Sequence, residues 1–382
     1  MEMSKPIKDG EPIVFLFIHG LHHLYHMVTI PFECAQIIRN HPIIIISVSE
    51  EHTRILEEVS NKYPNNKCEI ITLSPPIRYR FLNYKKKSYV SPLDSFPKIK
   101  PLLKKAGAVI STSHPTPRIL KKIGISKPIM IYIDHGCGDR KYSFEASLRE
   151  YDYLLISGKN TQKRLAEENA ANPEKTNIIG YPKFDNTIDI KDLGQKLFRH
   201  NRKIVYYAPH WEPTLASYKK YAHKIMEYFK NDDRYNLIFA PHTLLKHWSH
   251  KYNYNMDFHS SDNIHVDFGS RLSTDTSYVQ LADYFIGDVS SLIYEWIGIR
   301  PRPAVFLNAH DVDWKNNIDY RHWEYGPVID DIDNLLGAME QAVQPHWLKL
   351  QAERVKEYMD TNEQSPSKRA ALAIMNRLEV TS

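Results

Sequence analysis

Cysteine is scarce in this sequence, and long apolar runs are missing. Only 3 of the 382 residues are cysteines. They are scattered as Cys34, Cys68 and Cys137, so neither a disulfide framework nor a CxxC metal site is expected. The longest apolar run, residues 42–48, is far below the roughly 20 residues that a membrane-spanning helix needs. The first six residues lack the apolar stretch of a signal peptide. These absences favour a protein of the reducing cytoplasm.

A large excess of one charge is also missing. The chain carries 50 Lys and Arg residues against 45 Asp and Glu, which gives a net charge of +5. This balance is too small to indicate nucleic-acid binding, but it suits an anionic substrate or membrane surface. The hydrophobic fraction of 42% is that of an ordinary globular protein, and the length is enough for two or three domains.

Short apolar runs alternate with helical stretches along the chain. Strands are predicted at residues 14–18, 43–48, 68–73, 108–111, 129–133 and 153–157, and then at 203–207, 235–239, 264–266, 284–287 and 304–306. Helices fit the gaps, for example 51–62 and 161–170. Continuous apolar runs are typical of parallel strands that are buried on both faces.

This rhythm predicts an α/β protein with two facing doubly wound, Rossmann-like domains and the active site in the cleft between them. The first domain is expected over residues 1–195 and the second over residues 196–345. Helices over residues 346–382 should then pack back towards the first domain.

Histidines stand at three predicted strand ends, as His135, His210 and His242. Open α/β sheets bind ligands beyond the carboxyl ends of their strands. There, a histidine can act as a general base or, when protonated, stabilise a phosphate. Gly136 lets the backbone approach a ligand closely. The glycine spacing matches no dinucleotide fingerprint, which disfavours NAD.

A helix is expected to begin at Ser290 and Ser291, just after a strand that ends in Gly287-Asp288. The first N–H groups of a helix carry partial positive charge, and two hydroxyls there add donors for a phosphate. Capping of the helix by Asp288 or Ser290 explains the same residues without a ligand. The local sequence leaves both interpretations open.

Two further groups of residues suggest chemistry less strongly. His19, His22, His23 and His26 include pairs four residues apart, a spacing that is compatible with metal. No carboxylate pattern such as HExxH accompanies them, so a loop that lines the site is expected instead. Cys137 lies beside His135, but the sequence shows no orienting partner for a Cys/His nucleophile.

Basic and aromatic residues alternate between positions 78 and 89. They are Arg78, Tyr79, Arg80, Phe81, Tyr84, Lys85, Lys86, Lys87 and Tyr89. A solvated loop is the simpler interpretation. The functional interpretation is a peripheral contact with an anionic membrane, because cations attract anionic lipid while aromatic rings sit at the interface.

Several short segments between residues 130 and 330 share their order and spacing with one enzyme family. They are HGC at 135–137, GYPKFD at 180–185, YAPHWE at 207–212, PH at 241–242, GDVSSLIYE at 287–295, RPAVF at 302–306 and YGP at 325–327. They resemble the motifs HGT, GxPRxD, YAPTxR, HP, TDYSSxxxD, KPxxF and PGP of the CDP-glycerol glycerophosphotransferase family. Those enzymes build teichoic-acid-like polyol-phosphate polymers. The departures at Cys137, His210 and Glu212 indicate a distant member.

The resemblance implies a GT-B fold and a phosphotransferase in which an acceptor hydroxyl attacks the distal phosphate of the donor and CMP leaves. It implies catalytic roles for His135 and His242, donor-phosphate contacts from Ser290, Ser291, Gly136 and Lys183, and nucleotide contacts from Pro209, His210, Asp288 and Glu295. No cofactor and no metal are expected, because a helix dipole and cationic side chains would take the metal's place.

The implied partners are CDP-glycerol or a similar nucleotide donor and a lipid-linked or saccharide acceptor, in the synthesis of a cell-surface polymer or capsule. An anionic surface on the inner face of the cell membrane is a further candidate partner, and nucleic acid is not. A GT-B glycosyltransferase that uses a nucleotide sugar is the alternative. A non-catalytic scaffold with a decayed site is a third possibility, against which His135, His242 and the serine pair argue.

Overall fold

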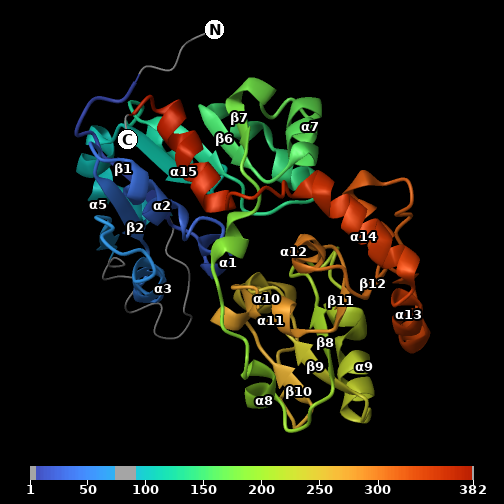
Figure 1. Ribbon diagram of the computed structural model, residues 1–382. Helices are drawn as coiled ribbons and strands as arrows, with labels where there is room; N and C mark the ends of the chain where they lie inside the picture. The colour runs from blue at the N-terminus through green and yellow to red at the C-terminus, as the bar shows by residue number, and fades with distance from the viewer. Residues whose placement is uncertain (1–5, 74–91, 381–382) are drawn as a thin grey trace. The chain divides into compact units, whose positions relative to one another are not determined.

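The computed structural model describes residues 6–73 and 92–380, and the chain folds into two compact units (Figure 1). Unit 1 comprises residues 1–137, 141–186 and 358–382, and unit 2 comprises residues 138–140 and 187–357. The sequence analysis placed this division after residue 195, whereas the units divide after residue 186. The basic segment at 78–89 lies outside the described residues.

Unit 1 is built on a seven-stranded sheet with the order β3-β2-β1-β4-β5-β6-β7, in which all neighbours pair in parallel. The strands are β1 (Ile13–Phe17), β2 (Ile43–Ser47), β3 (Glu69–Thr72), β4 (Ala108–Ser111), β5 (Ile129–Ile133), β6 (Tyr153–Ile156) and β7 (Thr176–Ile178). The direction of the strand order reverses between β1 and β4. Such a switch point leaves a crevice at the carboxyl ends of the two strands.

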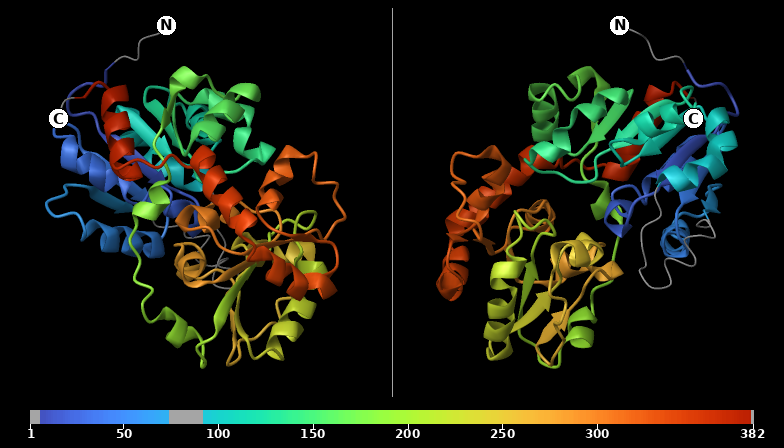
Figure 2. Two further views of the ribbon diagram at one scale, coloured as in Figure 1. Left: turned by 45° about the vertical axis from the view of Figure 1, so that its right-hand side comes forward. Right: turned by 180° about the vertical axis from the view of Figure 1, so that it is seen from behind.

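Helices cover both faces of this sheet, as Figure 2 shows. They are α1 (Leu21–Leu24), α2 (Ile30–Ile37), α3 (Glu50–Ser60), α5 (Pro92–Lys105), α6 (Thr116–Lys122), α7 (Lys159–Glu167) and α15 (Pro366–Arg377). Alternate strand residues point to opposite faces. Phe15 and Ile45 therefore pack with α2, α3 and α15, while Leu16 and Ile46 pack with α5, α6 and α7.

The end of the chain returns to unit 1, where α15 packs on α2. The backbone N–H of Ser367 donates to the Asp185 carboxylate at 2.6 Å, and the Ser367 and Thr29 hydroxyls lie 2.6 Å apart. The N–H of Asp360 donates to the Ser157 carbonyl at 2.9 Å. The last helix therefore completes one layer of the first unit.

Unit 2 is built on a six-stranded parallel sheet with the order β10-β9-β8-β11-β12-β13, and the order reverses between β8 and β11. The strands are β8 (Lys203–Ala208), β9 (Tyr235–Phe239), β10 (Ile264–Val266), β11 (Tyr284–Gly287), β12 (Ala304–Leu307) and β13 (Val328–Ile329). The helices are α8 (Leu193–Leu197), α9 (Tyr218–Lys230), α10 (Leu244–Tyr252), α11 (Ser277–Leu281), α12 (Leu292–Ile299), α13 (Leu335–Ala342) and α14 (Pro345–Tyr358). The prediction of two doubly wound parallel α/β sheets is confirmed.

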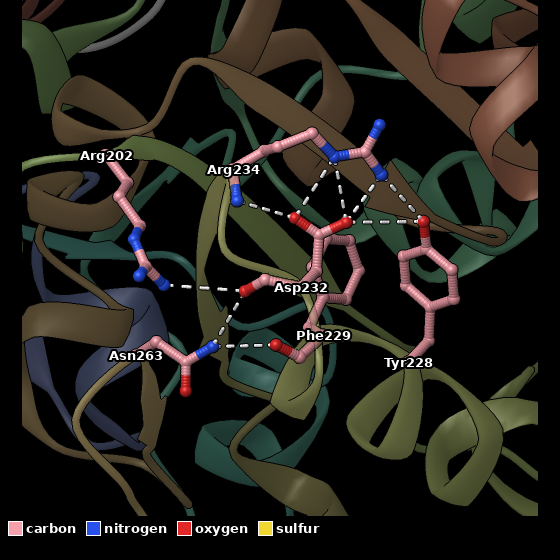
Figure 3. Close-up of polar contacts among 6 residues, drawn as sticks. All are labelled: Arg202, Tyr228, Phe229, Asp232, Arg234 and Asn263. Atoms are coloured by element: carbon pink, nitrogen blue, oxygen red, sulfur yellow. Dashed lines mark hydrogen bonds and ion pairs between the residues drawn. The ribbon is translucent and has the colours of Figure 1, made fainter.

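Polar contacts tie the amino ends of the unit 2 strands to the end of α9 (Figure 3). The Asn263 side chain, just before β10, donates to the Phe229 carbonyl at 2.7 Å. The Arg202 guanidinium, just before β8, donates to the Asp232 carbonyl at 3.4 Å. Burial alone would raise the pKa of Asp232, but hydrogen bonds from Arg234 lower it. This network lies at the amino ends of the strands, opposite their carboxyl ends.

Candidate functional site

Histidines gather at the carboxyl ends of β1, β4 and β5 in unit 1. This histidine cluster consists of His19, His22, His23, His26, His114 and His135. The His23 ring stacks on His135 with 4.2 Å between centroids, and His19 stacks on His23 at 4.6 Å. Because β1, β4 and β5 are neighbours in the sheet, their ends bring together histidines that are far apart in the sequence.

Burial favours the neutral form of five rings of this cluster, because it lowers the pKa of His19, His23, His26, His114 and His135. It lowers the pKa of His135 well below the usual range, and the neighbouring His114 and His19 lower it further. The pKa values of His23 and His26 are lowered for the same reason. A neutral imidazole can accept a proton, so His135 has the protonation state that a general base needs. In the described part of the chain, no three His, Cys, Asp or Glu side chains are placed to hold a metal ion.

Asp134 fixes the backbone that carries His135. Its carboxylate accepts the backbone N–H groups of His135 and Gly136 and the Ser157 hydroxyl, while burial raises its pKa to about 7. The N–H of Gly136 is therefore already engaged within the protein. Cys137, the next residue, is buried.

Lys183 lies in unit 1, close to the histidine cluster. It is buried in the 3-10 turn Pro182–Asp185. Burial lowers the pKa of His26, and the charge of Lys183 lowers it further. Gly180, at the start of the same motif, has φ of +84°, and a Cβ there would lie 2.8 Å from the Asp360 carbonyl. This glycine therefore allows the C-terminal segment to approach.

In unit 2, Asp288 links the ends of β8 and β11. Its carboxylate accepts the N–H of His210 at 2.9 Å and the N–H and hydroxyl of Ser217 at 2.6 and 2.8 Å. Burial raises the pKa of this carboxyl to about 6. The Asp288 carbonyl accepts the ring N–H of Trp323 at 3.0 Å and faces the His322 ring at 3.2 Å. These contacts make Asp288 a structural link beside the predicted nucleotide site.

The other two strand-end histidines lie near Arg140, a residue that the sequence analysis missed. The Arg140 guanidinium is 3.1 Å from Nε2 of His210, and the His210 and His242 rings are 5.7 Å apart. Nδ1 of His242 accepts the Leu244 N–H at 3.1 Å, so the neutral ring carries its proton on Nε2. Burial, with Arg140 as a second cause, lowers the pKa of His242 to about 4. Arginine suits phosphate recognition because it offers several N–H donors.

Residues 138–140 reach this place by packing on α12. Gly138 has φ of +156°, and a Cβ there would lie 3.1 Å from the Tyr294 ring. The Tyr294 hydroxyl donates to the Asp139 carboxylate. The close approach to α12 places Arg140 beside His210, and the Arg140 guanidinium also lies 3.7 Å from the Glu212 carboxylate. The sequence signal for it was a single arginine five residues after His135.

The predicted serine pair has two different environments at the start of α12. The Ser290 hydroxyl accepts the Leu292 N–H at 3.2 Å, whereas Ser291 is exposed and its side chain makes no capping hydrogen bond. Glu295 is buried within the helix, and Pro209 is buried beside His210. The capping interpretation therefore describes Ser290, and Ser291 is the hydroxyl presented at the helix start.

Sequence reasoning also missed several residues around His135. They are Thr112, His114, Tyr132 and Asp134. One signal was available, because His114 closely follows the predicted strand at 108–111, in the same way as the other strand-end histidines. Tyr132 gave no such signal, because an aromatic residue inside a buried strand is an ordinary core residue.

The chain was compared with known families and structures. The profile of the family described as CDP-glycerol:poly(glycerophosphate) glycerophosphotransferase matches residues 39–377. No curated protein is similar enough in sequence to match. The wall teichoic acid polymerase TagF shares 16% identity with a TM-score of 0.57, covering 96% of this chain and 88% of that one. S. aureus MnaA, solved with UDP, shares 12% with a TM-score of 0.58, covering 97% of each chain.

A third similar structure, the glycotransferase of kitacinnamycin, shares 12% identity with a TM-score of 0.55 and covers 98% of this chain and 100% of that one. At these identities the structural likenesses show a common GT-B fold. The family profile extends over most of the chain, including the β5 end in unit 1 and the β8, β9 and β11 ends in unit 2. The chain therefore belongs to the CDP-glycerol:poly(glycerophosphate) glycerophosphotransferase family and is an enzyme of this type.

Proposed function

We propose that this enzyme transfers glycerol phosphate, or a related polyol phosphate, from a CDP-activated donor to a hydroxyl of a saccharide or lipid-linked acceptor in the synthesis of a cell-surface polymer. The observation that carries this proposal is the group of cationic and N–H donors around residues 138–140 in unit 2. It combines the Arg140 guanidinium, the His242 ring and the start of α12.

These donors suit the diphosphate of a nucleotide donor. Arg140 can form charge-assisted hydrogen bonds with phosphate oxygens. Nε2–H of His242 is a further donor, and the first amides of α12, with Ser291, add partial positive charge. Preorganised donors of this kind stabilise the charge that develops on the phosphates and on the departing CMP. Pro209 and His210 are the proposed contacts of the nucleotide, held in place by Asp288, and Glu295 is proposed to support the same site from within α12.

His135 is the proposed general base. It takes the proton of the acceptor hydroxyl while the new O–P bond forms at the distal phosphate and the bond from that phosphate to the CMP oxygen breaks. Burial opposes the imidazolium in the free enzyme, whereas the negative charge of a bound donor favours it. Gly136 and Lys183 are proposed to contact the donor phosphates, Gly136 through close backbone approach because its N–H is bonded to Asp134.

The proposed setting is the cytoplasm, with the enzyme attached to the anionic inner face of the cell membrane through residues 78–89. Within residues 6–73 and 92–380, each helix is too short or too polar to cross a bilayer. The net charge of +5 suits both an anionic donor and an anionic surface.

Calorimetric titration with CDP-glycerol, CMP and a panel of UDP-sugars tests the function. We expect CDP-glycerol and CMP to bind, CMP to be released when an acceptor is added, and Arg140→Ala to weaken CDP-glycerol binding by at least tenfold. Binding of UDP-sugars alone would favour the glycosyltransferase alternative, which the likeness to the UDP-bound MnaA makes worth including. Absence of binding to every nucleotide would favour a scaffold.

A further inference from the structure

A buried tyrosine hydroxyl joins two histidines of the cluster in unit 1. Tyr132 is the fourth residue of β5 and is 2% exposed. Its hydroxyl lies 2.8 Å from Nδ1 of His135 and 3.0 Å from Nε2 of His114. The other ring nitrogen of His114, Nδ1, lies 3.5 Å from the Glu145 carboxylate. Three side chains thus form a hydrogen-bonded row that ends at the proposed base, and the Glu145 carboxylate lies beside its far end without a hydrogen bond to Nδ1 of His114.

We propose that the row His114–Tyr132, with Glu145 beside its far end, fixes the tautomer of His135, placing its proton on Nδ1 and leaving Nε2 free to accept the proton of the acceptor hydroxyl. Tyr132 and His114 are then positioning residues, because they act through His135. The catalytic consequence rests on the proposed function, whereas the tautomer itself does not.

The hydrogen-bonding capacity of the tyrosine carries this inference. Burial raises the pKa of Tyr132, and the nearby Asp134 raises it further, so its hydroxyl stays protonated. A single hydroxyl hydrogen can be donated to only one of the two histidines, and the hydroxyl oxygen must accept from the other. The donor-to-acceptor direction of the two Tyr132 hydrogen bonds is therefore set by the end of the row that lies beside a charged group.

Glu145 polarises the row at its far end. Burial lowers the pKa of His114, and the carboxylate of Glu145 acts in the opposite direction. A negative charge beside Nδ1 of His114 favours a proton on that nitrogen. Nε2 of His114 then accepts from the Tyr132 hydroxyl, and the Tyr132 oxygen accepts from Nδ1–H of His135. His135 is then the tautomer that carries its proton on Nδ1 and its lone pair on Nε2.

The same row stabilises the imidazolium that forms during transfer. When Nε2 of His135 takes the proton, its Nδ1–H still donates to Tyr132, and the row leads to a carboxylate. The neighbours that face His135 differ in effect. His19 and His114 disfavour the charge on His135, and the stacked ring of His23 adds no negative charge, while the Thr112 carbonyl, a second acceptor for a ring N–H, favours the charge. A neutral ring has one N–H, so Tyr132 and the Thr112 carbonyl can both accept from His135 only in the imidazolium. Because Thr112 competes for a ring N–H, the opposite tautomer is the outcome that the experiment must detect.

The test is a long-range ¹H–¹⁵N spectrum of the full-length protein labelled with ¹⁵N-histidine, with His135 assigned by its loss in His135→Gln. We expect wild-type His135 to be the Nδ1–H tautomer and Tyr132→Phe to shift it towards Nε2–H. Tyr151→Phe is the matched control. Its ring packs 5.4 Å from Tyr132, and its buried hydroxyl donates to the Ser113 carbonyl rather than to a histidine, so it should leave His135 unchanged.

Kinetics then test the catalytic consequence. Tyr132→Phe should lower kcat by about 10–100-fold, less than the roughly 10²–10⁴-fold contribution of a general base because His135 itself remains, and leave the KM for the donor within about twofold. Loss of the row disfavours the imidazolium, so the acid limb of the kcat/KM profile should move to lower pH. A wild-type His135 with its proton on Nε2, or a tautomer that ignores Tyr132→Phe, would overturn the inference even if the enzyme is a glycerophosphotransferase. If the tautomer responds but His135→Ala remains fully active, the assigned base is wrong and the row is still real.

Discussion

Burial controls the charge of the residues at both strand-end sites. It lowers the pKa of His135 and His242 and raises the pKa of Asp134 and Asp288. In each case burial shifts the pKa towards the neutral form, as expected where desolvation opposes charge.

The proposed base gives the first prediction at the residue scale. His135→Ala should lower kcat by about 10²–10⁴-fold while nucleotide binding stays nearly intact, because the proposed phosphate donors of unit 2 are unchanged. Turnover assays with CDP-glycerol measure this. His41→Ala is the control, since His41 is also buried but contacts the Glu11 carbonyl. Retention of more than about half of wild-type turnover in His135→Ala would exclude the role.

Asp134 gives a prediction about pH. Its pKa is about 7 in the folded protein and about 4 in an unfolded chain. A raised carboxyl pKa stabilises the fold most below pH 4, and this stabilisation disappears as the pH rises through 7. The Tm of the wild type should therefore fall relative to that of Asp134→Asn between pH 4 and pH 7 and level off above pH 7. Thermal unfolding at constant ionic strength gives the Tm of both proteins at each pH. Parallel plots of Tm against pH would contradict the raised pKa of Asp134.

At the scale of elements, the two serines at the start of α12 have different expected roles, capping for Ser290 and ligand binding for Ser291. Ser290→Ala should cost about 1 kcal/mol of stability, because it removes the oxygen that accepts the Leu292 N–H. Ser291→Ala should leave the Tm nearly unchanged and weaken CDP-glycerol binding by roughly tenfold or more, the effect of losing a hydrogen bond to a charged group. Chemical denaturation and calorimetry distinguish the two. A loss of stability in both variants with unchanged affinity would leave only the capping role.

A second prediction at this scale concerns Gly180, in the GYPKFD segment, and the C-terminal segment that packs against it. Gly180→Ala should destabilise unit 1 by more than Gly10→Ala. Both glycines have positive φ, at +84° and +78°, but a Cβ at Gly180 meets the Asp360 carbonyl and Arg369, while one at Gly10 meets nothing within 4 Å. The conformational cost of about 1 kcal/mol is common to both. Urea unfolding measures how much more unfolding free energy Gly180→Ala loses than Gly10→Ala. Equal losses in the two variants would show that the approach of the C-terminal segment does not add to the cost of a Cβ at Gly180.

At the scale of the whole molecule, the last prediction concerns attachment to a membrane. Liposome co-sedimentation should show salt-sensitive binding to anionic vesicles that is reduced in a variant with Lys85, Lys86 and Lys87 changed to Glu. Each cation near anionic lipid contributes about 1 kcal/mol, and salt screens the attraction. Neutral vesicles serve as the control. Equal sedimentation of both proteins would assign any contact to another surface.

Patterns within the sequence were sufficient to predict the secondary-structure elements and the family. Each predicted strand is present, and the helices expected at 51–62 and 161–170 appear as α3 and α7, because buried parallel strands and amphipathic helices have periodic signals within one short segment. β7 was not predicted because Thr176 and Asn177 are polar, and β13 because it has only 2 residues. The strand-end histidines were found because a parallel sheet places ligands at its carboxyl edge.

Which of those residues lie in contact depends on how the strands are ordered in the folded sheets. His114 and His135 share a tyrosine because β4 and β5 are neighbours in the sheet, and Arg140 lies beside His210 because Gly138 and Asp139 pack on α12. Contacts of this kind depend on strand order and on close backbone approach between segments that are distant in the chain. Local patterns of side chains carry no record of either, so the partners of the proposed base appeared only once the sheet was assembled.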